Sequence, residues 1–192
     1  MSNTTKMMIA GVGGQGVVYL TNLMVEAALN ANIAVATSEI HGLSQRGGSV
    51  TAGITFGENG YGFIEKGGAD FLIGLEPLEA QRSMPFLSPN SKAIIDDKRV
   101  LPFSVNSGKA VYPEVDLYIG FLEKNIEGVI LNTDFDDKIN PIHRNLYILG
   151  KSTRLDDFPV PVDKLEKAIA EMSKSMLKDE ALRVFRLGVD GG

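Results

Sequence analysis

The chain has 192 residues, of which 44% are hydrophobic and 22% charged, and its formal net charge is −5. This length and composition are typical of one compact, soluble domain over residues 1–192, and an acidic balance without basic runs excludes nucleic acid and anionic membrane surfaces as partners. With no Cys, 2 His outside any metal-ligand spacing, no long apolar run and no cleavable leader, we expect a cytoplasmic protein without disulfides, thiolate chemistry, a metal site or Cys-bound clusters.

The N-terminal part predicts a strand, a glycine turn, a helix and a second strand. Residues 6–10 form a short apolar run that ends at a glycine, as buried strands do. After residue 16 the apolar positions follow helical spacing, and they are Leu20, Leu23, Met24, Ala27 and Ala28. Residues 33–40 then indicate a second strand, which would complete a right-handed βαβ unit.

An antiparallel hairpin is expected next. A polar loop with several glycines, residues 38–50, separates the second strand from two β-rich runs. Asn59-Gly60 lies between these runs and is the residue pair that a type I′ turn favours. The sequence therefore predicts a hairpin insertion over about residues 49–65 in an otherwise mostly parallel sheet.

The remaining chain alternates strands and helices and ends in helices. The expected elements are a strand at 69–77, a helix at 77–87, a strand at 92–97, a mainly irregular stretch with one short extended piece at 98–113, a helix at 114–124 and a strand at 129–135. Asp163 and Glu166 resemble a capping box, and Gly188 is expected to end the last helix. The sequence thus predicts an α/β fold, a single three-layer α/β/α domain with a helical C-terminal end.

A GxGxxG turn follows the first strand and comprises Gly11, Gly13, Gly14, Gln15 and Gly16. Such a turn permits close packing of strand and helix and lets a pyrophosphate approach bare backbone. Glu39, at the end of the second strand, is placed to bind a ribose. Three interpretations stay open: packing alone, contact with NAD or FAD in an oxidoreductase that acts by itself, or a backbone surface that faces a partner.

The second loop joins a cation to bare backbone, and its candidate residues are Ser38, Glu39, His41, Gln45, Arg46, Gly47 and Gly48. Arg46 beside two glycines suits a phosphate or carboxylate, although a salt bridge followed by a simple turn is the alternative. Both loops should emerge at the carboxyl edge of the sheet and form one surface. His41 and Glu39 favour structural or interface roles, and His143 is expected at the surface or as a helix cap.

The segments GVGGQGV at 11–17 and SEIHGLSQRGGSV at 38–50 together resemble the gamma-type subunits and domains of 2-oxoacid:ferredoxin oxidoreductases, most closely the beta-subunit branch of the indolepyruvate enzymes. The resemblance covers nearly the whole chain, including LYILG at 146–150 and FRLG at 185–188. It implies a subunit of a complex that oxidises aryl pyruvates to acyl-CoA and reduces ferredoxin. A gamma subunit of the pyruvate or 2-oxoglutarate branch is the alternative.

The resemblance also implies which groups other chains carry. Thiamine diphosphate, Mg and 4Fe–4S clusters are expected on a large partner subunit, and CoA is a co-substrate of the complex. The residues agree, because this sequence has neither Cys nor the GDG motif of thiamine enzymes. The expected part of this chain is to complete or shield the active site and to stabilise the large subunit, with a pure scaffold as a further alternative. We assign no catalytic residue, expect the isolated chain to be inactive with an exposed apolar surface, and leave its homodimerisation open.

Overall fold

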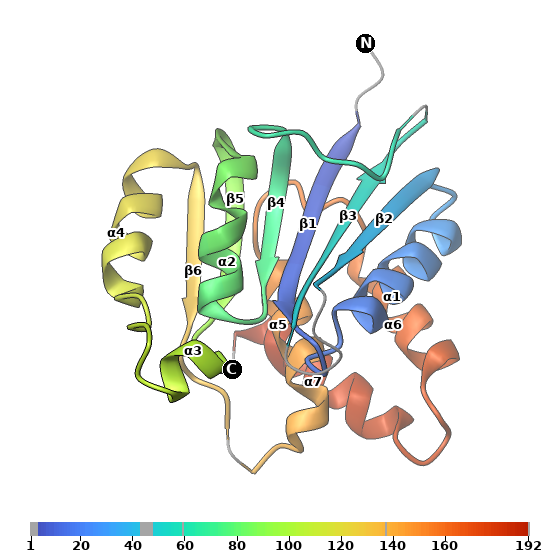
Figure 1. The fold of residues 1–192 in the computed structure, drawn as a ribbon. Coiled ribbons are helices and arrows are strands. Elements are labelled where there is room, and N and C mark those ends of the chain that lie inside the picture. The colour runs from blue at the N-terminus through green and yellow to red at the C-terminus, as the bar shows by residue number, and fades with distance from the viewer. Residues whose placement is uncertain (1–3, 43–47, 59, 137, 192) are drawn as a thin grey trace.

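The computed structural model describes residues 4–42, 48–58, 60–136 and 138–191, without the side chain of His41. Its centre is a six-stranded sheet in the order β2-β3-β1-β4-β5-β6 (Figure 1). The strands are β1 Thr5–Val12, β2 Val35–His41, β3 Ser49–Phe56, β4 Ala69–Gly74, β5 Leu87–Asp96 and β6 Gly128–Asn132. The pairs β1–β4, β4–β5 and β5–β6 are parallel, whereas β3 runs antiparallel to both β1 and β2.

Both faces of the central strands β1, β4 and β5 are buried, which explains their continuous apolar runs. In β1, Met7 and Ile9 belong to the core on one face, and Met8 and Ala10 belong to the core on the other. This alternation is the two-residue period of a strand. The parallel register places Ile9 beside Ile73 of β4 and keeps the apolar rows of neighbouring strands in contact.

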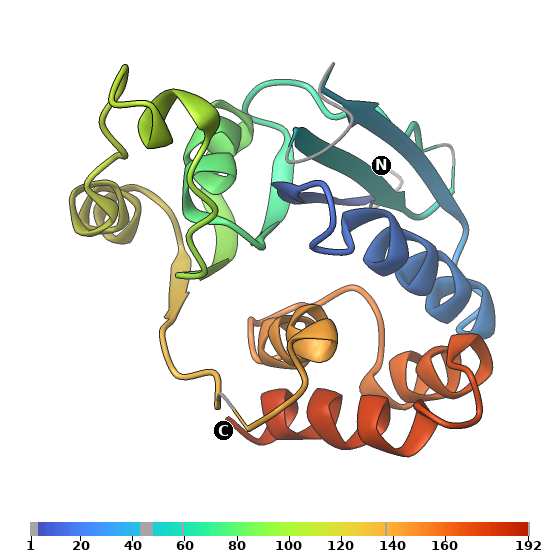
Figure 2. The ribbon, with the colours of Figure 1, turned by 60° about the horizontal axis from the view of Figure 1, so that its bottom comes forward.

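The helices cover the sheet in two layers. One face carries α1 Val17–Asn30, α5 Arg144–Ser152, α6 Val162–Met172 and α7 Lys178–Asp190, and the other carries α2 Pro77–Ser83 and α4 Val115–Asn125 (Figure 2). The predicted three-layer α/β architecture with a helical C-terminal end is therefore confirmed. Within the described ranges, none of the helices combines the length and the apolar character that crossing a membrane requires.

The predicted hairpin at 49–65 is wrong in its second half. Residues 61–65 form no strand, and the antiparallel partners of β3 are β1 and β2. The carbonyl oxygen of Gly62 accepts a hydrogen bond of 2.8 Å from Ser38 Oγ, and a Cβ at Gly62 would lie 2.1 Å from the Thr37 carbonyl carbon. This segment thus lies flat across the sheet. Because β3 pairs with both β1 and β2, these two strands are not adjacent. Asn59 of the expected turn lies outside the described residues.

Three other expectations also fail locally. The 98–113 stretch contains a short helix, α3 Phe103–Asn106, in place of an extended piece. Asp163 does not cap α6, because the helix begins after Pro161 and no side chain bonds to its first N–H groups. Gly188 lies inside α7, which ends at Gly191 with a φ of 102°.

Gly188 has a packing role instead. A Cβ at this position would lie 2.2 Å from the carbonyl oxygen of Tyr147, and a Cβ at Gly150 would lie 2.2 Å from that of Phe185. The two glycines therefore let the backbones of α5 and α7 touch where the helices cross. This crossing joins α7 to α5, which itself packs against β4 and β5.

Candidate functional site

The carboxyl ends of the parallel strands meet at one edge of the sheet, and the chain changes direction along the sheet between β1 and β4. Open α/β sheets bind ligands at such switch points. A cavity of about 540 Å³ lies there. The glycine turn, the end of β5, the start of α5 and the connection between α6 and α7 form its walls.

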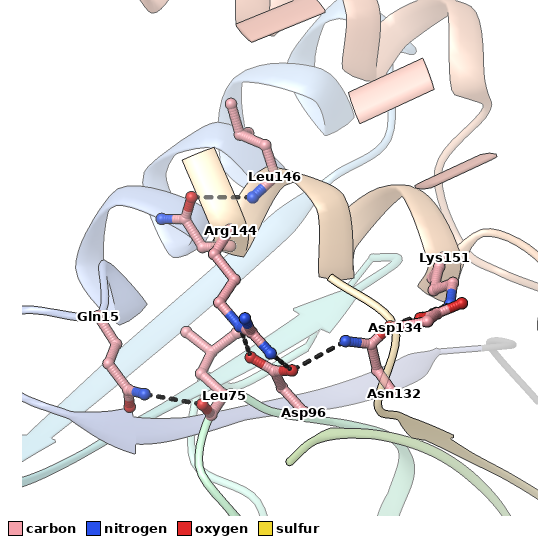
Figure 3. Close-up of polar contacts among 9 residues, drawn as sticks. Gln15, Leu75, Asp96, Asn132, Asp134, Arg144, Leu146 and Lys151 are labelled. Carbon is pink, nitrogen blue, oxygen red and sulfur yellow. Dashed lines mark hydrogen bonds and ion pairs between the residues drawn. The ribbon is translucent and has the colours of Figure 1, made fainter. Parts of the chain in front are cut away.

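The glycine turn is fastened by one side chain, that of Gln15. Its Oε1 accepts a hydrogen bond of 2.7 Å from the Val12 N–H, and its Nε2 donates one of 2.8 Å to the Leu75 carbonyl. These bonds tie the loop after β1 to the loop after β4, as Figure 3 shows for Gln15 and Leu75. Gln15 was a candidate for contact with a cofactor or partner, and in this structure its amide serves the fold.

The glycines of the turn differ in what they permit. Gly16 precedes α1 with a φ of 87°, and a Cβ there would lie 2.2 Å from Asn145 Nδ2 of α5. Gly11 is also crowded, because Gln15 Oε1 would lie 3.0 Å from its Cβ. Gly14 has a φ of 101°, and no atom of the described residues lies within 4 Å of its Cβ position. Close packing thus accounts for Gly11 and Gly16, whereas Gly14 presents open backbone.

The described ends of the two candidate loops lie side by side. The Gly13 N–H donates a hydrogen bond of 2.9 Å to the Gly48 carbonyl, and β3 begins next to the end of β1. Ser38 bonds to Gly62 and Glu39 is exposed on the edge strand β2. Gln45, Arg46 and Gly47 lie outside the described residues, as does the side chain of His41.

A buried polar network lies beside the cavity and was not expected from the sequence. Asp96, 2% exposed at the end of β5, accepts hydrogen bonds of 2.5 and 2.7 Å from Arg144 Nε and Nη2. Asn132 Nδ2 donates to the same carboxylate at 2.9 Å, and Asn132 Oδ1 accepts from Lys151 Nζ at 3.0 Å. Figure 3 shows these side chains joined in sequence, ending where Lys151 meets Asp134. The acidic end of the run KAIIDD was the local signal for Asp96, but nothing local identified its partners.

His143 is buried, which corrects the expectation of a surface or capping side chain. It is 6% exposed, and its backbone but not its side chain stands at the cap position of α5. Its Nε2 has no hydrogen-bond partner among the described residues and lies 4.0 Å from Glu180 Oε2 of α7. His143 thus lies near α7 and is one of the residues that border the cavity.

The charges around the cavity are mainly positive. Lys98, Arg144 and Lys174 border it together with one carboxylate, Asp96, whereas the whole chain carries a net charge of −5. In the part of the chain that is described, neither Lys98 nor Lys174 pairs with a carboxylate. Tyr19 also borders the cavity, and burial raises the pKa of its phenol despite a hydrogen bond with Ser173. The site is therefore suited to holding an anion rather than a cation.

The described residues support an anion site more than a metal site. Among the described residues no group of three or more His, Cys, Asp or Glu is placed to hold an ion. The one carboxylate that borders the cavity, Asp96, is already held by Arg144 through two hydrogen bonds.

Comparisons with known proteins agree on one family. Residues 6–191 match the family described as pyruvate ferredoxin/flavodoxin oxidoreductase. The chain is 36% identical over 184 residues to the indolepyruvate oxidoreductase subunit IorB of Archaeoglobus fulgidus, and the match covers 94% of this chain and 92% of that one.

Two solved structures share the fold of this chain, at sequence identities that support the fold alone. The gamma subunit of the keto/oxoacid ferredoxin oxidoreductase of Geobacter sulfurreducens PCA has a TM-score of 0.69 and 19% identity over 97% of this chain and 96% of its own. The 2-oxoglutarate:ferredoxin oxidoreductase of Magnetococcus marinus has a TM-score of 0.71 and 15% identity over 99% of this chain and 31% of its own.

Proposed function

The chain belongs to the pyruvate ferredoxin/flavodoxin oxidoreductase family, and from this premise we propose that it is the small, gamma-type subunit of a complex that oxidises indolepyruvate and related aryl pyruvates. The observation that carries the proposal is the 36% identity to an indolepyruvate oxidoreductase subunit over nearly the full length of both chains. We propose that residues 1–192 act as one gamma-type domain of that complex.

The chemistry of the complex divides between chains. The 2-oxoacid loses CO₂, its acyl group passes to CoA, and the two electrons released pass to ferredoxin. We place thiamine diphosphate, Mg and the 4Fe–4S clusters, which supply this chemistry, on a large partner subunit, because this chain has no Cys to ligate a cluster. The fold accounts for 31% of one long chain in the Magnetococcus marinus enzyme, which supports its association with further catalytic domains.

The part of this chain is to complete the partner's active site and to exclude water from it. The adjoining loops after β1 and β2 would face the thiamine site or the path of CoA, with Gly14 as open backbone and Arg46 as a cation. A partner surface is also available on the α3–α4 side of the molecule (Figures 1 and 2). Exposed large apolar side chains occur there, and they are Leu101, Phe103, Val111, Leu117 and Phe121.

Reconstitution with the large subunit tests the proposal. The two chains are expressed together under anaerobic conditions, and ferredoxin reduction is measured with indolepyruvate, phenylpyruvate, pyruvate and 2-oxoglutarate. We expect activity only when both chains are present, and the highest kcat/KM with an aryl pyruvate. Preference for pyruvate or 2-oxoglutarate would move the chain to another branch. Tight binding of NAD or FAD by the isolated chain would contradict the subunit proposal.

The Arg46→Ala variant separates a contribution to the active site from a pure scaffold. We expect the complex to assemble and its kcat/KM to fall about tenfold or more, because a charged hydrogen bond to an anion is lost. Arg183→Ala is the matched control, since Arg183 is exposed on α7 and does not border the cavity. Equal turnover in both variants would favour the scaffold.

A further inference from the structure

The cavity at the switch point has the features of a ligand site in this chain by itself. It measures about 540 Å³, within the range of small-molecule pockets. Its walls combine apolar side chains, including Tyr19, Leu146 and Leu177, with cationic side chains from separate elements. We propose that this cavity binds a small organic carboxylate with an aromatic or aliphatic body, which goes beyond the proposed function because it needs no partner chain.

The cationic side supports an anionic ligand. Lys98 follows β5 and Lys174 lies between α6 and α7, so two cations reach the cavity from different walls. Neither has a carboxylate partner among the residues that the structure describes. Tyr19 in the first turn of α1 and the first residues of α5 also border the cavity, and the N-terminal ends of helices attract negative charge. An anion would gain from all of these groups at once.

The same geometry disfavours a diphosphate. A pyrophosphate-binding turn needs free space and free N–H groups before its helix. Here Asn145 of α5 stands against Gly16, and the Gly13 and Gln15 N–H groups already donate to Gly48 and Val12 carbonyls. Arg144 is also held by both oxygens of Asp96. Two N–H groups of the turn are therefore already bonded, and Lys98 and Lys174 remain as cationic donors for a carboxylate.

The rest of the cavity suits an apolar body. Leu75 and Val100 border it from the loops after β4 and β5, and Met172 and Leu177 border it from the end of α6 and the residue before α7. A carboxylate beside Lys98 and Lys174 would leave the ligand's ring or alkyl chain against these side chains. Binding would then combine a charge-assisted hydrogen bond with the burial of apolar surface.

Proton NMR of the isolated full-length chain with phenylacetate tests the proposal. The sequence has 2 His residues, and the His143 ring borders the cavity, so the ring resonances of His143 report binding after a His41→Gln variant has assigned them. We expect phenylacetate to shift the His143 resonances in a saturable way. Phenylacetamide, which has the same shape without the charge, should bind about tenfold more weakly.

Variants at the cavity rim give the second measurement. The double substitution Lys98→Glu and Lys174→Glu should weaken phenylacetate binding about tenfold or more, because both residues are exposed cations at the cavity. Lys109→Glu is the matched control, since Lys109 is exposed and does not border the cavity. It should bind phenylacetate as the unchanged chain does. Circular dichroism confirms that each variant is folded.

The outcomes that overturn the proposal are distinct. No saturable shift with phenylacetate, or equal binding of phenylacetamide, would show that the cavity does not select a carboxylate. A response to inorganic phosphate or CoA without one to phenylacetate would identify a phosphate site instead. All of these results are obtained without the partner subunit. A failure of this proposal would therefore not change the conclusion of the reconstitution experiment.

Discussion

The polar network at the ends of β5 and β6 and the cavity beside it occupy the same edge of the sheet. Their charged side chains differ in burial and in pairing. In the network, Asp96, Asn132 and Lys151 are buried, and each has hydrogen-bond partners from the chain itself. At the cavity, Lys98 and Lys174 are exposed and face no carboxylate among the described residues. Burial explains the difference, because a buried charge without a partner costs several kcal/mol whereas water compensates an exposed one. Groups of the first kind hold the fold, and groups of the second kind remain free to bind.

The largest effect is expected from breaking the network. Asp96→Ala leaves Arg144 and Asn132 without their acceptor, and we expect the free energy of unfolding to fall by about 3–5 kcal/mol. Urea unfolding measures the change. Asp97→Asn is the control, because Asp97 pairs with Arg99 at the surface and the loss should stay below about 1 kcal/mol. Equal losses would show that burial does not separate the two classes of charge.

A methyl group added at the contact between α5 and α7 tests how much this contact contributes to the stability of the helices beside the cavity. In Gly188→Ala the new methyl group meets the Tyr147 carbonyl, and we expect a loss of about 2–3 kcal/mol in the free energy of unfolding. Gly120→Ala in α4 is the control, because no atom lies within 4 Å of its Cβ position. That variant should gain up to about 1 kcal/mol from helix propensity. A neutral Gly188→Ala would mean that the helices separate without cost.

A second buried carboxylate at this edge, Glu76, accepts hydrogen bonds from neutral donors only among the described residues. The stability of the protein at alkaline pH tests its effect on the neighbouring tyrosines. Tyr112 donates a hydrogen bond to Glu76, and burial, then this hydrogen bond and the charge of Glu76, raise the pKa of Tyr112. Burial, then Glu76, also raises the pKa of Tyr118. A raised phenol pKa stabilises the fold below the ordinary tyrosine value of 10.0 and loses this contribution as the pH rises above it.

We therefore expect the free energy of unfolding to decline above pH 10 and the decline to be shallower in Tyr112→Phe and Tyr118→Phe. Urea unfolding at a series of pH values measures this. Identical slopes in the variants and the unchanged chain would contradict the assignment.

The smallest effect on stability is expected at the cavity rim. Replacing Lys98 or Lys174 by Gln should change the free energy of unfolding by less than about 0.5 kcal/mol, because both side chains are exposed and unpaired within the described structure. Urea unfolding beside the phenylacetate titration separates the two consequences. A large loss of stability would place these lysines with the network rather than with the binding site.

The sequence by itself determined the order and type of most elements. Residues 6–10 fall within β1, residues 92–96 of the strand expected at 92–97 fall within β5, and the helical spacing from Leu20 to Ala28 falls within α1. These signals are local, since a strand buried on both faces must be apolar throughout and a covering helix must carry an apolar stripe. The strand ends that flank the two candidate loops also lie at one edge, as the order of the elements predicted.

Only the tertiary structure decided which elements meet and which polar groups face one another. β3 pairs with β1 and β2 rather than with residues 61–65, and Arg144 meets Asp96 from 48 positions along the chain. The role of Gly188 likewise depends on the carbonyl of Tyr147 in another helix. Local spacing carries the period of an element but not its distant partner, because pairing and burial depend on the packing of the whole chain. The cavity therefore emerged from the fold, although its glycine turn was visible in the sequence.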